Sequence, residues 1–512
     1  MKSIKNTTKY LMAAVVILLV LPSCKKFLDL DPQGRYDASN YPYPKGSGPF
    51  DGDIFAAYDV LRSYDATGSG FVAATSIRSD DADKGSTPTD GPSSKEFDDF
   101  TLISSNGLLD GMWKGYYNLI GKANAVLDRI EKDQDPTTTP EMKTFAEAEA
   151  KFLRGYGYFM LVRLFGRVPL VDKLYADASQ QANVPQSEPA AIYAFIESDL
   201  NFAGTHLPPN WNADIFPGRA TSGSANGLLA KVYLTQKKWG QAMSTANKVI
   251  TSGQYDLSTA YDKIFGEDGE NSKESVFEIQ CTANLTEKRA NGSQFASTQG
   301  VRGTGDWNLG WGFNVPSARL DAAYEANDPR KARTFLSMGV PSVYGEVFTA
   351  ANQAADAPKV YNHKIHSNPA RRKALLDNFS YWMNIRIIRY ADVVLMYAEA
   401  ANEVGGTANI TDAREKLNSV RTRARGSNGA ILPNVTFTDQ SDLREAIRHE
   451  RRIELAMEHD RFFDLVRWGI AESVLHAAGK TNYKTGTHEV LPIPAAQIQI
   501  SKGVLTQNFG YN

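Results

Sequence analysis

Apolar residues recur at three- and four-residue steps along most of the chain, which is the spacing of one buried face of an α-helix. In residues 111–132, Trp113, Tyr116 and Ile120 begin such a series, and Ile130 ends it. The same period predicts further helices over residues 144–166, 190–207, 221–253, 388–405, 411–425 and 441–469. A turn near 237–239 divides the range 221–253 into a helical hairpin. The chain is therefore predicted to be mostly α-helical.

These helices come in pairs, and alanines such as Ala225, Ala230, Ala242 and Ala246 allow the paired helices to approach closely. Pairs of this kind resemble tetratricopeptide units, although long insertions prevent a fixed period. The largest insertion, residues 266–380, is rich in Gly, Asn and Pro and shows little helical period. Loops held by a rigid scaffold are where binding residues concentrate. We therefore expect the ligand-binding face on this insertion.

The first 23 residues have the pattern of a secretory signal peptide that ends at Cys24. Residues 1–10 contain three lysines and no acid, and residues 11–21 are apolar throughout. Eleven residues are too few to cross a bilayer, which needs about 20, so a transmembrane anchor is disfavoured. Cys24 resembles the cysteine of a bacterial lipobox, which is acylated after cleavage, although Pro22 departs from that motif. Ordinary cleavage that leaves a free thiol is the alternative.

Charge and cysteine content exclude several classes of function. The chain has a net charge of −2, and removal of three lysines with residues 1–23 makes it −5. A mild negative charge argues against a nucleic-acid partner, for which a basic face is expected. The second of the two cysteines, Cys281, lies in an apolar stretch and is predicted to be a small buried residue rather than a disulfide partner, a nucleophile or a metal ligand. Residues 24–50 are predicted to form a tether and an N-terminal loop.

Six segments follow one another along the chain: CKKFLDLDP, MWKGYYNLIGKANAVLD, AEAKFLRGYGYFMLVRLFGRVPLV, IIRYADVVLMYAEAANEVG, REAIRHERRIELAMEHDRFFDLVRWG and LPIPAAQIQISKGVLTQNFGY. Together, in this order, they resemble the SusD/RagB family of outer-membrane nutrient-binding lipoproteins of Bacteroidota. A small departure from the family pattern is His459, where glycine is commoner, and we expect no functional effect from it.

The resemblance implies one SusD-like domain over residues 51–512, with helical repeats at about 51–265 and 381–470. Four tetratricopeptide-like pairs would form a right-handed scaffold, and the insertion would contain the ligand face. The protein would be anchored to the cell surface through Cys24. It would act as a hinged lid on a SusC-like TonB-dependent transporter, to which it would deliver an oligosaccharide or, less often, a peptide.

The most suggestive polar stretch is SIRSDDADKGSTPTDG, residues 76–91. The carboxylates of Asp80, Asp81 and Asp83 could accept hydrogen bonds from sugar hydroxyls, and Arg78 could donate two parallel ones. The spacing of Asp81, Asp83 and Gly85 also resembles a calcium loop, but the later ligands of an EF-hand are missing. We expect no resident cofactor, with calcium as an alternative. A solvated or structural loop is the competing interpretation.

Trp307 and Trp311, in GTGDWNLGWGFNVP, are the strongest candidates for a sugar-binding platform. A flat indole can cover the C–H face of a sugar ring, and the neighbouring glycines would leave it open. Asp306 and Asn308 could hold hydroxyl groups at the rim. Alternatively, one or both indoles plug the insertion against the scaffold, since Trp is highly buried on average. Trp211 is a weaker candidate.

The stretch RHERRIELAMEHDRF invites a catalytic interpretation that its spacing does not support. His449 and Glu450 are not followed by a second histidine at zincin spacing. The charges fall at helical steps, which favours ion pairs, so we predict structural roles for Glu450, Arg452, Glu454, Arg461 and Asp464. Two other functions stay open: a glycoside hydrolase, which needs paired carboxylates about 5–9.5 Å apart, and a periplasmic scaffold that binds only protein.

Overall fold

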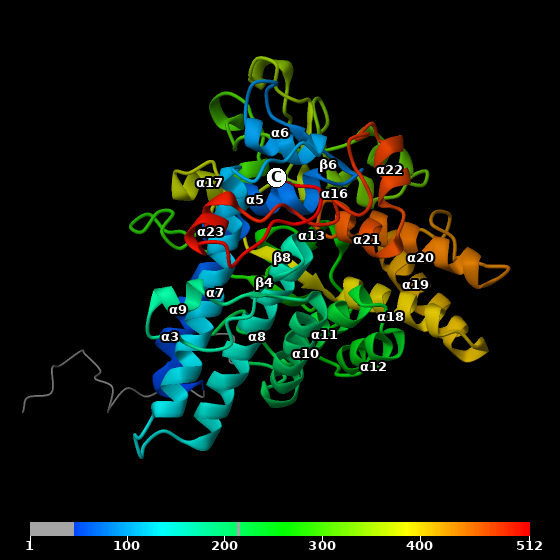
Figure 1. The fold of residues 1–512 in the computed structure, drawn as a ribbon. Helices are drawn as coiled ribbons and strands as arrows, with labels where there is room; N and C mark the ends of the chain where they lie inside the picture. The colour runs from blue at the N-terminus through cyan, green and yellow to red at the C-terminus, as the bar shows by residue number, and fades with distance from the viewer. Residues whose placement is uncertain (1–45, 212–215, 512) are drawn as a thin grey trace, which may run out of the picture. The chain divides into compact units, whose positions relative to one another are not determined.

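Every range predicted to be helical contains helix, and the helices of the main array pack against one another in chain order (Figure 1). The computed structural model describes residues 46–211 and 216–511. Each helix of the main array packs against the next one along the chain. The array consists of α3 (Asp51–Leu61), α7 (Gly107–Lys132), α8 (Pro140–Phe165), α10 (Pro189–His206), α11 (Ser222–Thr235), α12 (Trp239–Ile250), α18 (Tyr390–Val404) and α19 (Thr407–Arg425).

Local chemistry sets the ends of these helices. Thr139 caps α8 by accepting a hydrogen bond from the Met142 amide, and Gly166, at φ 68°, ends the helix. Thr221 and Ser224 form a reciprocal capping box at the start of α11. Because caps and apolar period are both local features, the predicted and observed bounds of these helices agree closely.

The single helix predicted over residues 441–469 is wrong, because the chain breaks into α20 (Gln440–Glu454) and α21 (Arg461–Trp468). Between them Met457 and His459 adopt left-handed backbone conformations, with φ of 64° and 72°. A helix cannot continue through such residues. Glycine adopts the left-handed conformation without strain, so the φ of 72° at His459 gives a physical reason why glycine would suit this position.

Short strands join the insertion to the rest of the chain. β4 (Ser275–Ile279) pairs antiparallel with β8 (Ile385–Arg389), so the two ends of the predicted insertion meet on the helical array. The other antiparallel pairs are β1 (Ala82–Gly85) with β5 (Phe313–Pro316), β2 (Val168–Pro169) with β3 (Gln186–Ser187), and β6 (Phe335–Ser337) with β7 (Val360–Asn362).

Short helices complete the fold, and the insertion is as rich in loops as predicted. Among residues 46–211 and 216–511, no helix combines the length and apolarity that a membrane crossing requires. The signal peptide, Cys24 and most of the predicted tether lie outside the described residues. The short helices are α4 (Tyr64–Thr67), α5 (Ser69–Val72), α6 (Pro92–Asp99), α9 (Ala178–Ala182), α13 (Tyr261–Ile264), α14 (Phe295–Gln299), α15 (Ala318–Ala323), α16 (Arg330–Thr334), α17 (Pro369–Leu375), α22 (Ala471–Ala477) and α23 (Ala495–Ile500).

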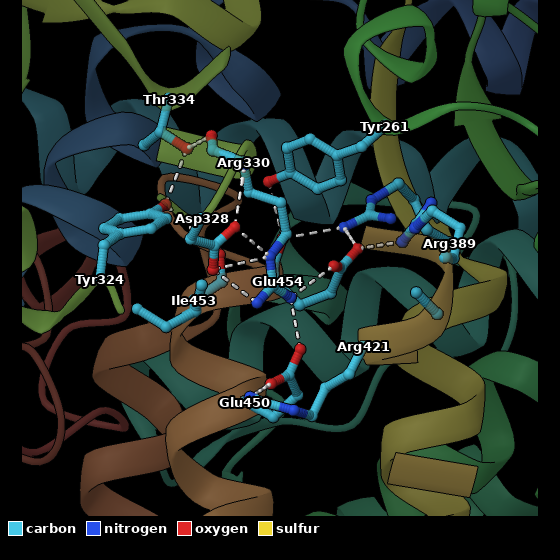
Figure 2. Close-up of polar contacts among 12 residues, drawn as sticks. Tyr261, Tyr324, Asp328, Arg330, Thr334, Arg389, Arg421, Glu450, Ile453 and Glu454 are labelled. Carbon is cyan, nitrogen blue, oxygen red and sulfur yellow. Dashed lines mark hydrogen bonds and ion pairs between the residues drawn. The ribbon is translucent and has the colours of Figure 1, made fainter. Parts of the chain in front are cut away.

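A buried network of ion pairs connects the insertion to α20 (Figure 2). The carboxylate of Glu454 is fully buried and accepts hydrogen bonds from Arg330 of α16 at 3.1 Å and Arg423 of α19 at 2.5 Å. Arg389 of β8 lies 3.0 Å from the same carboxylate. Burial alone would raise the pKa of Glu454, but these arginines outweigh it and hold the pKa below its usual range. The predicted structural role of Glu454 is confirmed.

The other charged residues of this stretch also form internal ion pairs. Glu450 contacts Arg330 and Arg421, the latter at 3.0 Å. Asp464 accepts a hydrogen bond from Arg451 at 2.7 Å. The structural roles predicted for Glu450 and Asp464 are therefore confirmed.

Candidate functional site

The two stretches that the sequence singled out lie side by side, because they form the β1–β5 pair. Gly85 is opposite Phe313, and the amide of Ser86 donates a hydrogen bond to the carbonyl of Gly312 at 2.6 Å. A Cβ atom at Gly85 would lie 2.5 Å from that carbonyl oxygen, so only glycine fits there. This pairing places the strand that contains Asp83 beside the loop that contains Trp311.

Asp80 and Asp81 are buried, which corrects the prediction that they meet a ligand. They are 4% and 2% exposed. Arg461 holds Asp80 with two hydrogen bonds of 2.8 and 3.0 Å, and Arg452 holds Asp81 at 2.8 Å. These contacts confirm the structural roles predicted for the two arginines. Burial opposes ionisation of Asp80, but the hydrogen bonds from Arg461 prevail and keep its pKa below the usual value.

Arg78 is also internal, so its predicted role as a donor to a ligand is wrong. The residue is 0% exposed, and its guanidinium lies 3.9 Å from the centre of the Phe462 ring. It donates a hydrogen bond to the carbonyl of His488. Burial lowers the pKa of Arg78 to about 10. Of the acceptors predicted in this stretch, Asp83 is the exposed one.

The calcium alternative has no cluster of ligands to support it. Within the described ranges, no group of three or more His, Cys, Asp or Glu side chains is arranged to hold a metal ion. In the stretch that resembled a calcium loop, Asp81 is engaged by Arg452. Cys281 is buried and forms no disulfide with another described residue, and burial raises the pKa of its thiol to about 12. The prediction that it is a small buried residue is confirmed.

Trp307 is not a platform, because the insertion folds around it. Its side chain is 7% exposed and stacks on the His366 ring, with centroids 5.7 Å apart and planes 13° from parallel. It packs with Leu309, Phe348 and Tyr361 in a small core of the insertion. The plugging role that was the alternative for Trp307 is therefore correct. Its neighbours Asp306 and Asn308 are both exposed.

Trp311 is 49% exposed, and the backbone on either side of it is held firmly. Its amide donates to the carbonyl of Ser297 at 2.8 Å, and the Gly312 amide donates to Gly300 at 2.9 Å. A Cβ atom at Gly310 would lie 2.1 Å from the oxygen of Ser297, so the glycine permits this close approach. The structure thus fixes an exposed indole on a rigid turn, as predicted for this residue.

Two further aromatic residues lie beside Trp311, and the sequence analysis missed both. The ring of Phe379 has its centroid 6.3 Å from that of Trp311, and Tyr381 follows at 6.5 Å from Phe379. Both are half-buried. We call Trp311, Phe379 and Tyr381 the aromatic platform. The available signal was the cluster of aromatic residues in NFSYW at the end of the predicted insertion.

An arginine holds the platform together. The guanidinium of Arg289 donates two hydrogen bonds to Asp377, at 2.6 and 2.7 Å, and lies 4.9 and 4.3 Å from the ring centres of Phe379 and Tyr381. The amide of Ser293 also donates to the carbonyl of Tyr381 at 2.9 Å. Residues 284–293 and 377–381 are thereby tied into one surface beside Trp311.

Asp377, the carboxylate that the platform arginine holds, is unsuited to acid catalysis. Burial would raise the pKa of Asp377, but hydrogen bonds from Arg289 and the Phe379 amide lower it below the usual value. A general acid in a glycosidase needs a raised pKa and a second carboxylate across the cleft. The arrangement can therefore bind flat apolar faces and hydroxyl groups, with Asp377 serving to position the rings.

The other tryptophans lie in packed surroundings. Trp211 lines a cavity of about 560 Å³, but Arg219 covers its ring at 4.1 Å and its indole nitrogen donates to the Ala220 carbonyl. Trp382 is buried and donates to Glu267 at 3.0 Å. Neither offers an open face comparable to that of Trp311.

Comparisons with known proteins agree with both the fold and the order of its parts. A family model described as "SusD family" matches residues 360–511, and one described as "Starch-binding associating with outer membrane" matches residues 65–234. SusD-like protein P2 of Formosa agariphila is 28% identical over 98% of this chain and 100% of its own length.

Solved structures extend the likeness over most of the chain. A laminarin-binding SusD-like protein aligns with a TM-score of 0.74 and 28% identity, over 91% of this chain and 100% of its own. Surface glycan-binding protein A from Bacteroides thetaiotaomicron, solved in complex with laminarihexaose, aligns with a TM-score of 0.75 and 25% identity. That alignment covers 90% of this chain and 98% of the other.

Proposed function

The chain belongs to the SusD/RagB family, and on that premise we propose that it is a non-catalytic protein that binds a glycan at the cell surface. The observation that supports this function most directly is the aromatic platform, which a rigid turn and an arginine clamp present on the loop-rich insertion. Two similar structures come from proteins described as binding laminarin or laminarihexaose.

The chemistry of the platform suits a sugar ring. The axial C–H groups of a pyranose form an apolar face, and an aromatic ring can cover that face through dispersion and loss of exposed apolar area. Covering the exposed half of Trp311 would contribute on the order of 2 kcal/mol. Asp83, Asp306 and Asn308, all exposed, are the polar candidates for hydroxyl groups at the rim.

We further propose that the protein acts from the outer surface of the outer membrane, where acylated Cys24 anchors it. It would deliver its ligand to a SusC-like TonB-dependent transporter and act as its lid. On intact cells, external protease should degrade the native protein. A Cys24→Ala variant should leave the outer-membrane fraction. Protection of the native protein from protease would contradict the surface location.

Two alternatives use the same site. A peptide could bind the aromatic platform, which is the less common ligand that the family resemblance implies. A glycoside hydrolase is disfavoured because Asp377, the carboxylate beside the rings, is ion-paired with Arg289. Release of reducing sugar from a polysaccharide that the purified protein binds would promote the hydrolase alternative.

The test is affinity electrophoresis of residues 25–512 through gels that contain single polysaccharides. The variant Trp311→Ala should lose the retardation that the parent shows. Phe509→Ala, which removes an aromatic residue that is 83% exposed and outside the platform, is the matched control and should behave like the parent. Retardation that is equal in Trp311→Ala and parent would remove the platform as the site. No retardation on any glycan would favour the peptide alternative.

A further inference from the structure

The two segments that frame the aromatic platform are basic, although the chain as a whole is not. Residues 284–292 and 369–381 together contain five cations and two carboxylates, a net charge of +3, whereas the whole chain has −2. Carboxylates outside the two segments offset this surplus: Glu346 pairs with Arg372, Glu267 accepts a hydrogen bond from the Asn368 amide, and Asp306 lies in the Trp311 loop. The cations are Lys288, Arg289, Arg371, Arg372 and Lys373.

The ion pairs of these five cations show which of them remain available to a ligand. Arg289 is engaged by Asp377, and Arg372 by Glu346 at 2.6 Å. By contrast, Lys288, Arg371 and Lys373 are exposed and have no ion-pair partner among the described residues. Both carboxylates of the two segments are occupied, because Asp377 is held by Arg289 and Glu287 accepts hydrogen bonds from two asparagine side chains.

The three free cations are joined to the platform by short stretches of chain. Lys288 precedes Arg289, whose guanidinium lies over the rings of Phe379 and Tyr381. Arg371 and Lys373 lie on α17, which ends at Leu375, two residues before Asp377. Exposed charges act over about 8 Å at physiological ionic strength. A ligand long enough to extend beyond the rings toward either segment therefore meets positive charge.

We propose that the platform binds an anionic glycan, one with carboxylate or sulfate groups, rather than a neutral one. This proposal rests on the proposed function. The sugar rings stack on Trp311 and the neighbouring rings. Their anionic groups pair with Lys288, Arg371 and Lys373, which form no ion pair with a carboxylate of the described residues. Because these cations are exposed, their contribution falls as salt concentration rises.

The test compares each anionic polymer with its own neutral derivative. A polyuronate and its carboxyl-reduced form test the carboxylate source, and a sulfated polysaccharide and its desulfated form test the sulfate source. Binding of residues 25–512 is measured by affinity electrophoresis and titration calorimetry. The parent should bind at least one anionic polymer about tenfold more tightly than its neutral derivative, and the difference should shrink between about 0.05 and 0.5 M salt.

Two triple variants that remove the same number of charges test whether the anionic preference comes from Lys288, Arg371 and Lys373. Lys288→Gln, Arg371→Gln and Lys373→Gln combined should weaken binding of the anionic polymer about tenfold and leave binding of the neutral form unchanged. The control combines Lys122→Gln, Lys248→Gln and Lys502→Gln, which removes three exposed charges from other parts of the chain. The control should bind like the parent.

The possible outcomes distinguish a failure of the anionic preference from a failure of the proposed glycan-binding function. Equal binding of the anionic and neutral forms, lost in Trp311→Ala, would overturn the anionic preference and leave glycan binding in place. An anionic preference that both triple variants reduce equally would overturn the assignment to these three residues. No binding of any polymer would count against the proposed function itself.

Discussion

Replacement of Glu454 by glutamine tests whether the buried ion network stabilises this fold. Glu454 is 0% exposed and is shared by Arg330 and Arg389 (Figure 2). Arg423 also pairs with it. Glutamine has nearly the same shape, so the change removes the charge and leaves the packing intact. Removing one partner of a buried ion pair costs about 3–5 kcal/mol, because the remaining charge is left uncompensated.

The structure places the expected loss at the lower end of that range. Each of the three arginines keeps at least one other carboxylate after the substitution, so none becomes a fully isolated charge. We therefore expect the free energy of unfolding to fall by about 3 kcal/mol. The remaining carboxylates are Asp328 and Glu450 for Arg330, Glu274 and Glu458 for Arg389, and Glu274 for Arg423.

The matched control is Glu445→Gln on the same helix. The Glu445 side chain is 67% exposed and pairs with Arg448 one turn away, so its loss should cost less than about 0.5 kcal/mol. Unfolding of residues 25–512 is followed in guanidinium chloride, and the midpoints are compared at unchanged slope. Equal midpoints for the two variants would refute the claim that the network stabilises the fold.

Three further predictions test other parts of the structure. Trp307→Ala should cost about 3–5 kcal/mol because the residue fills a core, whereas Trp311→Ala should cost less than about 1 kcal/mol; similar unfolding midpoints would contradict this contrast. Burial lowers the pKa of His459 to about 4, so the free energy of unfolding should fall by about 3 kcal/mol as pH falls from 7 to 4. His459→Asn should remove that loss. The same pH dependence of unfolding in the parent and the variant would refute this prediction. Tyr381→Ala should weaken glycan binding without moving the melting temperature, and undiminished retardation in affinity electrophoresis would exclude Tyr381 from the site.

The sign of the His459 effect follows from its environment. The folded state holds the imidazole neutral because the residue is buried against Phe71 and Phe295, and its Nδ1 pairs with Thr75 at 2.9 Å. The unfolded chain takes up a proton near pH 6.5. Stability is therefore complete above that pH and is lost as pH falls toward 4. Asparagine tolerates the left-handed backbone and does not titrate, which makes it the appropriate replacement.

The helical array could be predicted because its signals are local. Apolar period, caps and terminal glycines all lie within a few residues of the helix that they define. The wrong prediction of one helix over residues 441–469 also has a local cause, but the residue types do not reveal it. His459 and Met457 are not residues that mark a break by their type, and only their left-handed conformations reveal it.

The candidate site was only partly predictable, because burial in a loop depends on contacts that are distant in sequence. Trp307 and Trp311 are four residues apart in the same glycine-rich segment, yet one is 7% and the other 49% exposed. Their difference is set by His366 and Phe348, which cover Trp307 from 59 and 41 residues along the chain. Without a helical or strand period, nothing in the segment itself separates the two tryptophans.

Contacts that are distant in sequence also explain why the ligand-binding role predicted for Asp80 and Asp81 was wrong. Clustered aspartates in a loop suggest exposure, but Arg452 and Arg461, about 370–380 residues later, draw Asp80 and Asp81 inside. Both arginines were predicted to be structural from their helical spacing, and that prediction is confirmed. Their partners were sought on the same helix, whereas they lie at the other end of the chain.

These internal contacts have a consequence for binding. Asp80 and Asp81 are fixed by α20 and α21, and the next residues form β1, which pairs with β5 directly after Trp311. Arg389, which is paired with Glu454, is the last residue of β8, the strand that follows Tyr381 along the chain. The segments that contain the rings are therefore attached on both sides to buried ion pairs of the scaffold. Because a preorganised aromatic surface loses little entropy when a ligand binds, the buried charges would support the proposed recognition without touching the ligand.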